Sequence, residues 1–492
     1  MVGRDVILIE STGSSALREM FKQRYPYPPV GILSISSFLK LHGYRTHLID
    51  LMLEDYSRAG FAERLRSMGA RPIAVGVSVY TDCFQEGIEI IAAVRQALPG
   101  TPIVVGGPHG TFRPEEVLRQ TAADFVVRHE GESPIVELLE HLRSPEGLPL
   151  ERIASLSYRG GDGQVHSNPP RPFLTRLDQL PFPDYDGLPA LRSSYAESFL
   201  FVSSRGCPGD CIYCASRAMS GRRYRFHSAE WIFALAYEYH RRHRFHRLVF
   251  LDDTFTVDRR RARSFCRYLR EAWPGATPPR WVCKSRVDTL SDEICAEIAE
   301  AGCVAVHIGV ESGDQRVLDA IAKHIRLDQV FSALRAIHRH GMRADCSFII
   351  GHHADTRETI EKTVLFAEAI RQSGLGTAVI GISTPLPGTR LLDAAAELGV
   401  EITVRNWARY TLTNPIYHTR NFTENDLRRA MLAFDQGTAG GPGGVGLTAL
   451  DHREFREELA RFLAELAADA DVAGEGARAS ERDRRPKREA VR

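Results

Sequence analysis

Arg-Gly-Cys-Pro-Gly-Asp-Cys-Ile-Tyr-Cys, residues 205–214, places three cysteines in one short loop with the spacing C-x3-C-x2-C. A loop this tight can fold the thiolates of Cys207, Cys211 and Cys214 around one small inorganic core. Four thiolates usually hold a [4Fe–4S] cluster. Three thiolates leave one iron with an open position, where a ligand can bind and be activated. The loop therefore indicates an iron–sulfur centre that acts on a bound ligand.

Two other interpretations of the three cysteines stay open. They can be structural zinc ligands with His227 as the fourth, or buried thiols without a role. The surrounding sequence favours the cluster. A strand-like run, residues 198–202, leads directly into the loop, and a long alternation of strands and helices follows it. A zinc knuckle requires neither feature.

Length and composition narrow the class of protein. The 492 residues predict two or three domains, and 43% hydrophobic with 25% charged residues are typical of a soluble globular protein. The net charge of +1 provides no basic field for nucleic acid, and no apolar run approaches the length of a membrane span. The chain enters a strand at once, so we expect no signal peptide. Nine unevenly spaced cysteines fit free thiols in a reducing cytoplasm.

Residues 1–145 predict a doubly wound (Rossmann-like) α/β domain, because short β-branched runs alternate with helical stretches. The expected strands are Val6–Ile9, Arg45–Leu48, Pro72–Val79, Pro102–Val105 and Asp124–Val127. Ligands of this fold bind outside the carboxyl ends of the strands, at the switch point. Ser78 and Thr81 lie at the end of the third strand, and Gly106, Gly107 and His109 at the end of the fourth. These five are the candidate binding residues of the domain.

Residues 196–395 predict six strand–helix units, which suit a partial (β/α)6 barrel. The expected strands are Phe199–Val202, Leu248–Leu251, Trp281–Lys284, Val304–Val310, Arg343–Ile350 and Thr377–Ile382. Functional side chains of α/β barrels cluster at the carboxyl ends of the strands. The polar residues at those ends are Asp252, Asp253, Arg286, Glu311, His352 and His353.

The cysteine loop and the units after it resemble the radical S-adenosylmethionine (SAM) enzymes. In that family the amino and carboxylate groups of SAM chelate the open iron, and an electron from the cluster cleaves SAM to a 5′-deoxyadenosyl radical. Gly-Val-Glu-Ser-Gly, residues 309–313, and Pro-Leu-Pro-Gly-Thr, residues 385–389, match one subclass well. The resemblance implies five candidate SAM-binding residues: Tyr213 at the adenine, either Asp252 or Asp253 at the ammonium, Arg286 at the carboxylate, and Glu311 at the ribose or amine. A helix cap at Asp252-Asp253 and a surface ion pair of Arg286 are the alternatives.

One departure from the family pattern concerns residues 351–356. This chain has Gly-His-His-Ala-Asp-Thr where the family usually has Gly-x-Pro-Gly-Glu-Thr. We expect His352 and His353 to face the SAM or substrate cavity, and at least one of them to help bind the substrate. The alternative is two solvated loop histidines.

The N-terminal domain resembles the cobalamin-binding domain of the same subclass. The resemblance rests on Tyr-Pro-Pro-Val-Gly at 27–31, Gly-Gly-Pro-His at 106–109 and Glu-Gly-Glu at 130–132. In cobalamin domains a Ser-x-Leu and a Gly-Gly element line the pocket of the nucleotide tail; Ser78 and the glycine pair match them, with Tyr80 in place of the leucine. The Asp-x-His-x-x-Gly element that supplies a lower cobalt ligand is absent. A flavodoxin-like domain without a cofactor is the alternative.

The remaining segments complete the expected domain order. Residues 146–195 form a Pro-rich connector with a hairpin at 153–166. Residues 396–470 form a small, mainly helical region that encloses the substrate, with a helix at 451–467. The charged tail, 471–492, is expected to be disordered.

Up to about residue 430 the chain resembles a cobalamin-dependent radical SAM enzyme, which implies a [4Fe–4S] cluster, SAM and cobalamin as cofactors. The most common chemistry of this subclass is methylation of an unreactive carbon. One SAM methylates Co(I), and a second SAM yields the radical that abstracts a substrate hydrogen. The substrate radical then takes the methyl group from methylcobalamin. We expect a small-molecule natural product as substrate, as in antibiotic biosynthesis, and an external electron donor of the flavodoxin or ferredoxin type.

Other functions stay open at this point. The same architecture supports oxidative cyclisation of a tetrapyrrole and radical ring rearrangement, both without methyl transfer. A corrinoid- or cluster-binding protein without turnover is a further alternative. We expect neither a nucleic-acid nor a membrane partner, and a cytoplasmic location.

Overall fold

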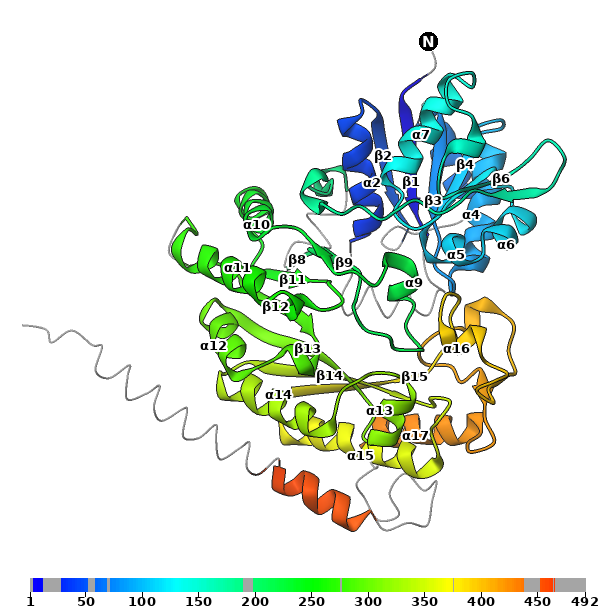
Figure 1. Ribbon diagram of the computed structural model, residues 1–492. Helices are drawn as coiled ribbons and strands as arrows, with labels where there is room; N and C mark the ends of the chain where they lie inside the picture. Colours follow the sequence, from blue (N-terminus) through cyan, green and yellow to red (C-terminus); the bar gives the residue numbers. More distant parts are fainter. Residues whose placement is uncertain are drawn as a thin grey trace, which may run out of the picture. The chain divides into compact units, whose positions relative to one another are not determined.

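The computed structural model describes residues 3–11, 28–51, 58–68, 71–188, 198–274, 277–374, 376–437, 452–462 and 464. The chain divides into two compact units (Figure 1). The first consists of Met1–Asp253 and Thr384–Tyr417, and the second of Thr254–Ser383 and His418–Arg492. Tyr27 and the tail at 471–492 lie outside the described residues.

The first unit contains a seven-stranded sheet in the order β2-β1-β3-β4-β5-β6-β7. Its strands are β1 (Asp5–Glu10), β2 (Arg45–Asp50), β3 (Ala74–Ser78), β4 (Ile103–Gly106), β5 (Phe125–Val127), β6 (Leu156–Arg159) and β7 (Val165–Ser167). The first five strands pair in parallel, and the β6–β7 hairpin adds two antiparallel strands at one edge. The doubly wound domain and the connector hairpin are therefore confirmed.

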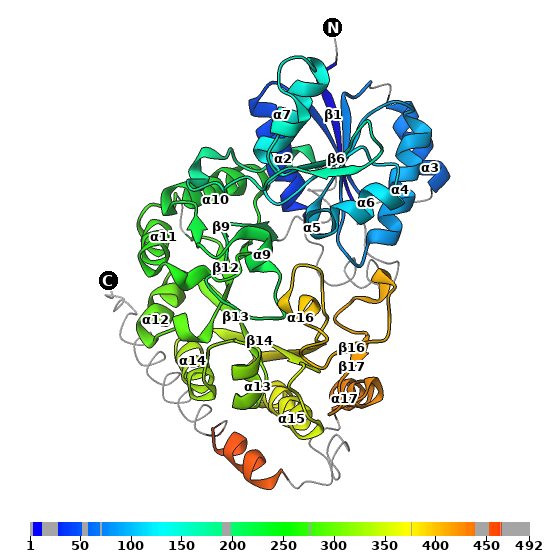
Figure 2. The ribbon, with the colours of Figure 1, turned by 45° about the vertical axis from the view of Figure 1, so that its right-hand side comes forward.

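Helices cover both faces of this sheet (Figure 2). α2 (Val30–Leu41) packs against α7 (Glu132–Arg143) on one face, and α3 (Arg58–Ser67) packs against α4 (Phe84–Ala97) on the other. In α4 the apolar residues recur at helical spacing, and Ile90, Ile91 and Val94 are completely buried. The short helices α5 (Gly107–Phe112) and α6 (Pro114–Gln120) connect β4 to β5.

β1 is the switch point of the sheet, because β2 lies on one side of it and β3 on the other. At its carboxyl end Glu10 is paired with Asp50 of β2 and with Ser78 of β3. Burial and the charge of Asp50 raise the pKa of the Glu10 carboxyl to about 8. This edge of the sheet is where doubly wound domains bind their ligands.

The cysteine loop belongs to the same unit. Strand β8 (Ser198–Phe201) pairs in parallel with β11 (Arg247–Phe250), and an antiparallel ribbon of β9 (Ser204–Arg205) and β10 (Arg225–Phe226) closes the base of the loop. The further elements of the unit are α9 (Ser216–Ser220), α10 (Ala229–His243), α16 (Arg390–Asp393), β16 (Glu401–Ile402), and the 3-10 turns η1 (Leu150–Arg152), η2 (Leu177–Gln179), η3 (Tyr185–Gly187) and η6 (Trp407–Arg409).

The second unit contains four parallel strands that pair in chain order, β12 (Arg280–Ser285), β13 (Cys303–Glu311), β14 (Arg343–Ile350) and β15 (Gly376–Ile382). With β8 and β11 they make six strands, each within one residue of the bounds that the sequence predicts. The helical elements of the unit are η4 (Phe255–Val257), α11 (Arg259–Glu271), η5 (Val287–Thr289), α12 (Asp292–Glu300), α13 (Gln315–Ala320), α14 (Leu327–Arg339), α15 (Arg357–Ser373) and α17 (Glu424–Gln436).

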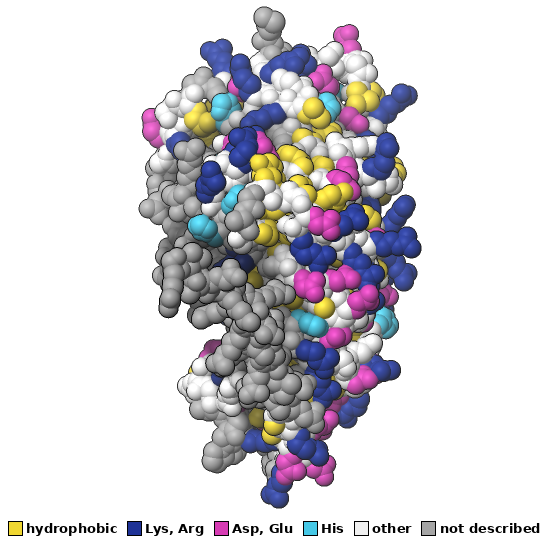
Figure 3. Space-filling model, turned by 90° about the vertical axis from the view of Figure 1, so that its left-hand side faces the viewer, with side chains coloured by type: hydrophobic (Ala, Val, Ile, Leu, Met, Phe, Trp, Pro, Cys, Tyr) yellow, Lys and Arg dark blue, Asp and Glu magenta, His cyan; other side chains and the backbone are white. Residues whose placement is uncertain are grey.

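A last helix, over residues 453–462, confirms part of the one expected at 451–467. It packs on the second unit through Phe462, whose ring centroid lies 4.3 Å from that of Phe331. β17 (Tyr417–His418) precedes α17. No helix in the described ranges is long and apolar enough to cross a membrane. On the face drawn in Figure 3, basic and acidic side chains are interspersed, in keeping with a net charge of +1.

Candidate functional site

A cavity of about 570 Å³ in the first unit brings the two predicted cofactor sites together. One part of its wall comes from the carboxyl ends of β3 and β4, where Ser78, Gly106 and Gly107 lie. Another part comes from the cysteine loop and the end of β11, including Ser216, Asp252 and Asp253. The switch point of the sheet and the cysteine loop therefore face one space.

Gly107 gives the cavity a wall of bare backbone. Its φ of +88° is a backbone conformation that residues other than glycine rarely adopt. A Cβ at this position would lie 2.8 Å from the carbonyl oxygen of Val79 and 2.9 Å from the nitrogen of Val79. The turn thus packs directly on the end of β3. Such a surface lets a large, flat ligand approach the main chain, which fits a corrinoid.

Thr81 and His109 lie outside the cavity wall, unlike the other three candidates of the domain. Both side chains are buried, and His109 Nδ1 lies 3.3 Å from Thr81 Oγ1. The ring of His109 packs 4.1 Å from that of Phe84, and burial lowers its pKa to about 4. The neutral imidazole of His109, a residue of α5, is therefore enclosed by the domain and does not face the ligand space.

The three loop cysteines differ from the other six. Cys207 and Cys211 are half-buried and Cys214 is exposed, whereas the remaining cysteines are all buried. The loop is held by its own main chain: Cys214 N–H donates to the Cys211 carbonyl, and Cys207 N–H to the Gly221 carbonyl. Ser216 N–H donates to Cys214 Sγ at 3.5 Å. Three accessible thiols, one already accepting a backbone hydrogen bond, fit an iron–sulfur cluster.

The structure does not gather the three cysteines and His227 into a zinc site. His227 Nδ1 lies 3.2 Å from an Asp178 carboxylate oxygen, and its ring stacks on Trp231 with centroids 3.6 Å apart. Among the described residues, no three His, Cys, Asp or Glu side chains are placed to hold a single metal ion. A [4Fe–4S] cluster needs its thiolates farther apart, because each binds a different iron.

Asp252 and Asp253 have different surroundings. Asp252 is 1% exposed, and its carboxylate accepts hydrogen bonds from Ser203 N–H, Ser203 Oγ and Ser204 N–H at 2.5, 2.5 and 3.1 Å. It therefore fixes the backbone that leads into the loop. Asp253 is exposed and accepts from Ser216 Oγ at 3.2 Å, the same serine that donates to Cys214. Of the two carboxylates, Asp253 is therefore the exposed one, on the cavity wall and bonded to the serine next to Cys214.

Tyr213 is half-buried, and its loop is supported by residues that follow the Pro-Leu-Pro-Gly-Thr segment at 385–389. Just after that segment, Leu391 N–H donates to the Ile212 carbonyl at 2.9 Å. Arg390 lies 3.8 Å from Asp210. Residues almost 180 positions apart in the chain thus fix the position of Tyr213.

In the second unit, Glu311 and Arg286 are joined by a residue that the sequence analysis misses, Lys323. Lys323 Nζ lies 2.6 Å from Glu311 Oε1, and both side chains are almost fully buried. Arg286 donates to the Lys323 carbonyl at 2.8 Å and pairs with Asp288 at 2.9 Å. Glu311 also has an unusual φ of +70°. Strained, enclosed charges of this kind are typical of binding sites.

His352 is buried, contrary to the solvated-loop alternative. It is 1% exposed, and burial lowers its pKa to about 3, although the charge of Glu311 acts in the opposite direction. The backbone N–H of His352 donates to Asp355 Oδ2 at 2.8 Å. His353 is half-buried, and burial lowers its pKa as well. The neutral imidazole of His352 thus lies in the electrostatic field of Glu311.

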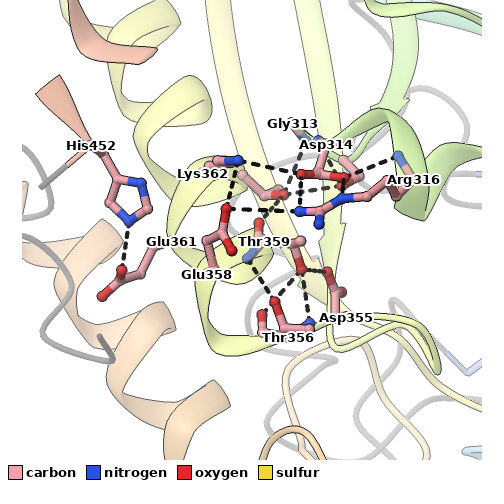
Figure 4. A network of polar contacts seen from close by, with 12 residues as sticks. Gly313, Asp314, Arg316, Asp355, Thr356, Glu358, Thr359, Glu361, Lys362 and His452 are labelled. Atoms are coloured by element: carbon pink, nitrogen blue, oxygen red, sulfur yellow. Dashed lines mark hydrogen bonds and ion pairs between the residues drawn. The ribbon is translucent and has the colours of Figure 1, made fainter. Parts of the chain in front are cut away.

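A polar network fixes the loops that carry Glu311 and His352 (Figure 4). Thr359 Oγ1 donates to Asp355 at 2.6 Å, and Gly313 N–H donates to Thr363 Oγ1 at 3.0 Å. Asp314 pairs with Arg316 at 2.9 Å. Both loops are therefore anchored to the first two turns of α15.

We expect His352 to make the protein sensitive to acid. Its folded pKa lies below the ordinary value of 6.5, so its contribution to stability is lost as pH falls below about 6.5, by up to about 1.4 kcal/mol per pH unit. His352→Gln should therefore gain stability relative to the wild type on going from about pH 7.5 to about pH 5.5.

Urea unfolding of both proteins at the two pH values tests this. Burial raises the pKa of Asp355 to about 7, so its effect runs in the opposite direction. The difference between the two proteins, and not the wild-type curve alone, isolates His352. The exposed His246 serves as control, because His246→Gln should change in stability between the two pH values by the same amount as the wild type. Identical pH dependence of wild type and His352→Gln would contradict a buried, neutral His352.

Family models and curated relatives agree with this geometry. The model described as Radical SAM superfamily matches residues 201–367, and the B12 binding domain model matches residues 20–139. An uncharacterized methyltransferase of Pyrococcus horikoshii is 32% identical over 83% of this chain and 87% of its own length. An anaerobic magnesium-protoporphyrin IX monomethyl ester cyclase of Rubrivivax gelatinosus is 26% identical over 79% of this chain and 70% of its own length.

Solved structures confirm the predicted fold class. The radical SAM methyltransferase TsrM of Kitasatospora setae, with cobalamin and a [4Fe–4S] cluster bound, aligns with a TM-score of 0.68 and 17% identity, over 95% of this chain and all of its own. The cobalamin-dependent SAM radical enzyme OxsB, with aqua-cobalamin and SAM bound, aligns with a TM-score of 0.72 and 17% identity, over 96% of this chain and 72% of its own. The chain therefore belongs to the family of cobalamin-dependent radical SAM methyltransferases, whose cofactors are a [4Fe–4S] cluster, SAM and cobalamin.

Proposed function

We propose that this enzyme methylates an unactivated carbon of a small-molecule natural product by a radical mechanism. One observation carries the proposal. The cavity of the first unit is lined by the bare backbone at Gly106-Gly107 and by residues that flank the loop cysteines. The wall suited to cobalamin and the loop suited to the cluster therefore border one space, in which a substrate carbon can meet both.

When bound, the cluster supplies the electron that cleaves SAM, and cobalamin carries the methyl group. The chain's own residues bind and orient. Cys207, Cys211 and Cys214 would hold three irons, and Asp253 would accept the SAM ammonium beside them. Asp252 would act indirectly, by fixing the backbone at Ser203 and Ser204.

Further contacts complete the proposed binding sites. Tyr213, Arg286 and Glu311 would bind SAM, with Lys323 holding Glu311 in place. His352 and His353 would contribute to the substrate site. At His352 the imidazole would act as a neutral hydrogen-bonding group, because its pKa lies far below neutral pH.

Product analysis tests this function. Protein reconstituted under anaerobic conditions is given hydroxocobalamin, SAM with a CD3 methyl group, a strong one-electron reductant and small-molecule extracts. In the overall reaction, the substrate R–H, two molecules of SAM and two electrons give the methylated product R–CH3. The by-products are S-adenosylhomocysteine, 5′-deoxyadenosine and methionine, in equal amounts. We expect a product that carries one CD3 group. An external flavodoxin or ferredoxin would replace the chemical reductant.

The cyclase among the relatives supports one alternative function, oxidative cyclisation. In that case 5′-deoxyadenosine would form in step with a product that carries no CD3 group, and S-adenosylhomocysteine would not accumulate. That result would overturn the methylation proposal while leaving the radical SAM chemistry in place.

A further inference from the structure

The two strands at the base of the cysteine loop place two arginines against each other. In the β9–β10 ribbon, Arg205 is directly opposite Arg225, and the residues between them, 206–224, contain all three loop cysteines. Like charges opposite each other destabilise an antiparallel pair. A ribbon of two residues per strand has little else to hold it together. The loop therefore needs negative charge from elsewhere.

Two glutamates of the N-terminal domain supply that charge. Glu130 Oε1 lies 2.6 Å from Arg225 Nη1 and 3.3 Å from Arg205 Nη1. Glu132 Oε1, in the first turn of α7, lies 2.5 Å from Arg205 Nη2 and accepts from Ser34 Oγ at 3.0 Å. Burial alone would raise the pKa of Glu132, but Arg205 lowers it, so the carboxylate is ionised. We call Glu130, Glu132, Arg205 and Arg225 the ion cluster.

Arg225 extends the ion cluster to the far end of the loop. Its guanidinium donates to the carbonyl of Ser220, the last residue of α9, at 2.7 Å, and to the carbonyl of Leu174 at 2.8 Å. Glu130 in turn accepts from Leu174 N–H at 2.8 Å. Both ends of the cysteine-containing segment are thus tied to Glu130, and the end that carries Arg205 is tied to Glu132 as well.

The ion cluster is enclosed, so its charges depend on one another. Side-chain exposure is 3% for Arg225, 4% for Glu132, 13% for Glu130 and 19% for Arg205. Removing one partner of a buried pair leaves an uncompensated charge, which strongly destabilises the structure around it. Loss of Glu132 therefore affects the backbone that leads directly to Cys207.

The ion cluster also forms part of the cavity wall. Ser34, Glu130, Glu132 and Arg205 line the cavity together with Gly106 and Gly107. A ligand seated in that cavity would cover these charges and restrict their motion. The same side chains thus touch the ligand space on one side and support the cysteine loop on the other.

We propose that the ion cluster couples the two cofactor sites: Glu132 and Arg205 are positioning residues that hold the cysteine loop in its cluster-binding shape, and cobalamin in the cavity strengthens that hold. The inference rests on the cavity being the cobalamin site. Because coupling between binding sites is reciprocal, the assembled cluster should in turn tighten cobalamin binding.

The test measures the loss of the iron–sulfur absorbance after addition of an iron chelator, with and without hydroxocobalamin, under anaerobic conditions. In the wild type we expect cobalamin to slow this loss about tenfold, within the usual range of coupling between sites. Glu132→Gln should lose its cluster faster and lose most of the protection by cobalamin. Glu137→Gln is the matched control, since Glu137 lies on the same helix α7 and pairs with Arg171 at 2.5 Å outside the cavity wall.

A double variant separates coupling from a general loss of structure. Glu132→Gln combined with Arg205→Gln leaves no stranded charge, so it should retain the cluster longer than either single variant. Unchanged cluster loss in wild type on adding cobalamin would overturn the proposal, as would full cobalamin protection in Glu132→Gln. Strictly additive effects in the double variant would also overturn it. None of these readouts requires methyl transfer, so they stand apart from a failure of the proposed function.

Discussion

Replacing Cys207, Cys211 and Cys214 together with alanine will remove the iron–sulfur absorbance of the reconstituted protein and abolish reductive cleavage of SAM. The wild type should hold about four irons per chain. The reason lies in the exposure of the cysteines: these three thiols are the accessible ones, on a loop that faces the cavity. Iron analysis, the visible spectrum and the yield of 5′-deoxyadenosine under strong reductant measure the outcome.

Two buried cysteines provide the controls for this experiment. Cys83 and Cys266 are buried, and burial raises the pKa of the Cys266 thiol to about 12, so it is a poor source of thiolate. Cys83→Ala and Cys266→Ala should retain the wild-type iron content. A triple variant with a normal cluster would contradict the assignment of the loop, whereas iron loss in the two controls would point to a general folding defect.

The sheets and the cysteine loop could be predicted from the sequence because their signals are local. Most parallel strands are short runs rich in apolar residues, and burial on both faces makes such runs stand out from the helices. The three cysteines of the loop lie within eight consecutive positions. Where a pattern and its flanking elements lie within a few residues of each other, the structure predicted from the sequence agrees with the observed one.

The direction in which a side chain points was harder to predict. His109 follows the glycine pair at the end of β4, yet its ring is enclosed against Phe84. Asp252 follows β11 as expected, but three hydrogen bonds from Ser203 and Ser204 occupy its carboxylate. Position at a strand end identifies candidates, and only tertiary packing decides which of them face the ligand.

Long-range ion pairs could not be predicted at all. Lys323 lies 12 residues from Glu311, and Arg205 lies 73 residues from Glu132. A charge run in a sequence is most often a solvated surface, so no local pattern distinguishes these partners. In the sequence, the Glu-Gly-Glu string at 130–132 is marked only by its resemblance to cobalamin-binding domains. The ion pairs of Glu130 and Glu132 with Arg205 and Arg225 are visible only in the structure.

Gly107→Ala should weaken cobalamin binding about ten- to a hundredfold, because overpacking a close contact costs about 1–3 kcal/mol. The new Cβ would lie 2.8 Å from Val79 O and 2.9 Å from Val79 N. Neither atom can yield easily, since Val79 N–H donates to the Gly106 carbonyl and His109 N–H donates to the Val79 carbonyl. The end of β3 or the turn after β4 must therefore shift, and both belong to the cavity wall.

Gly100→Ala is the matched control for this variant. Its φ of +78° is close to the +88° of Gly107, so both substitutions carry a similar backbone cost of about 1–2 kcal/mol. A Cβ at Gly100, however, meets nothing within 4 Å. Equilibrium dialysis with hydroxocobalamin should show wild-type affinity for Gly100→Ala and weak binding for Gly107→Ala, with circular dichroism confirming that both are folded. Equal affinities would mean that the glycine turn is not the cobalamin wall, because the two variants differ chiefly in that one contact.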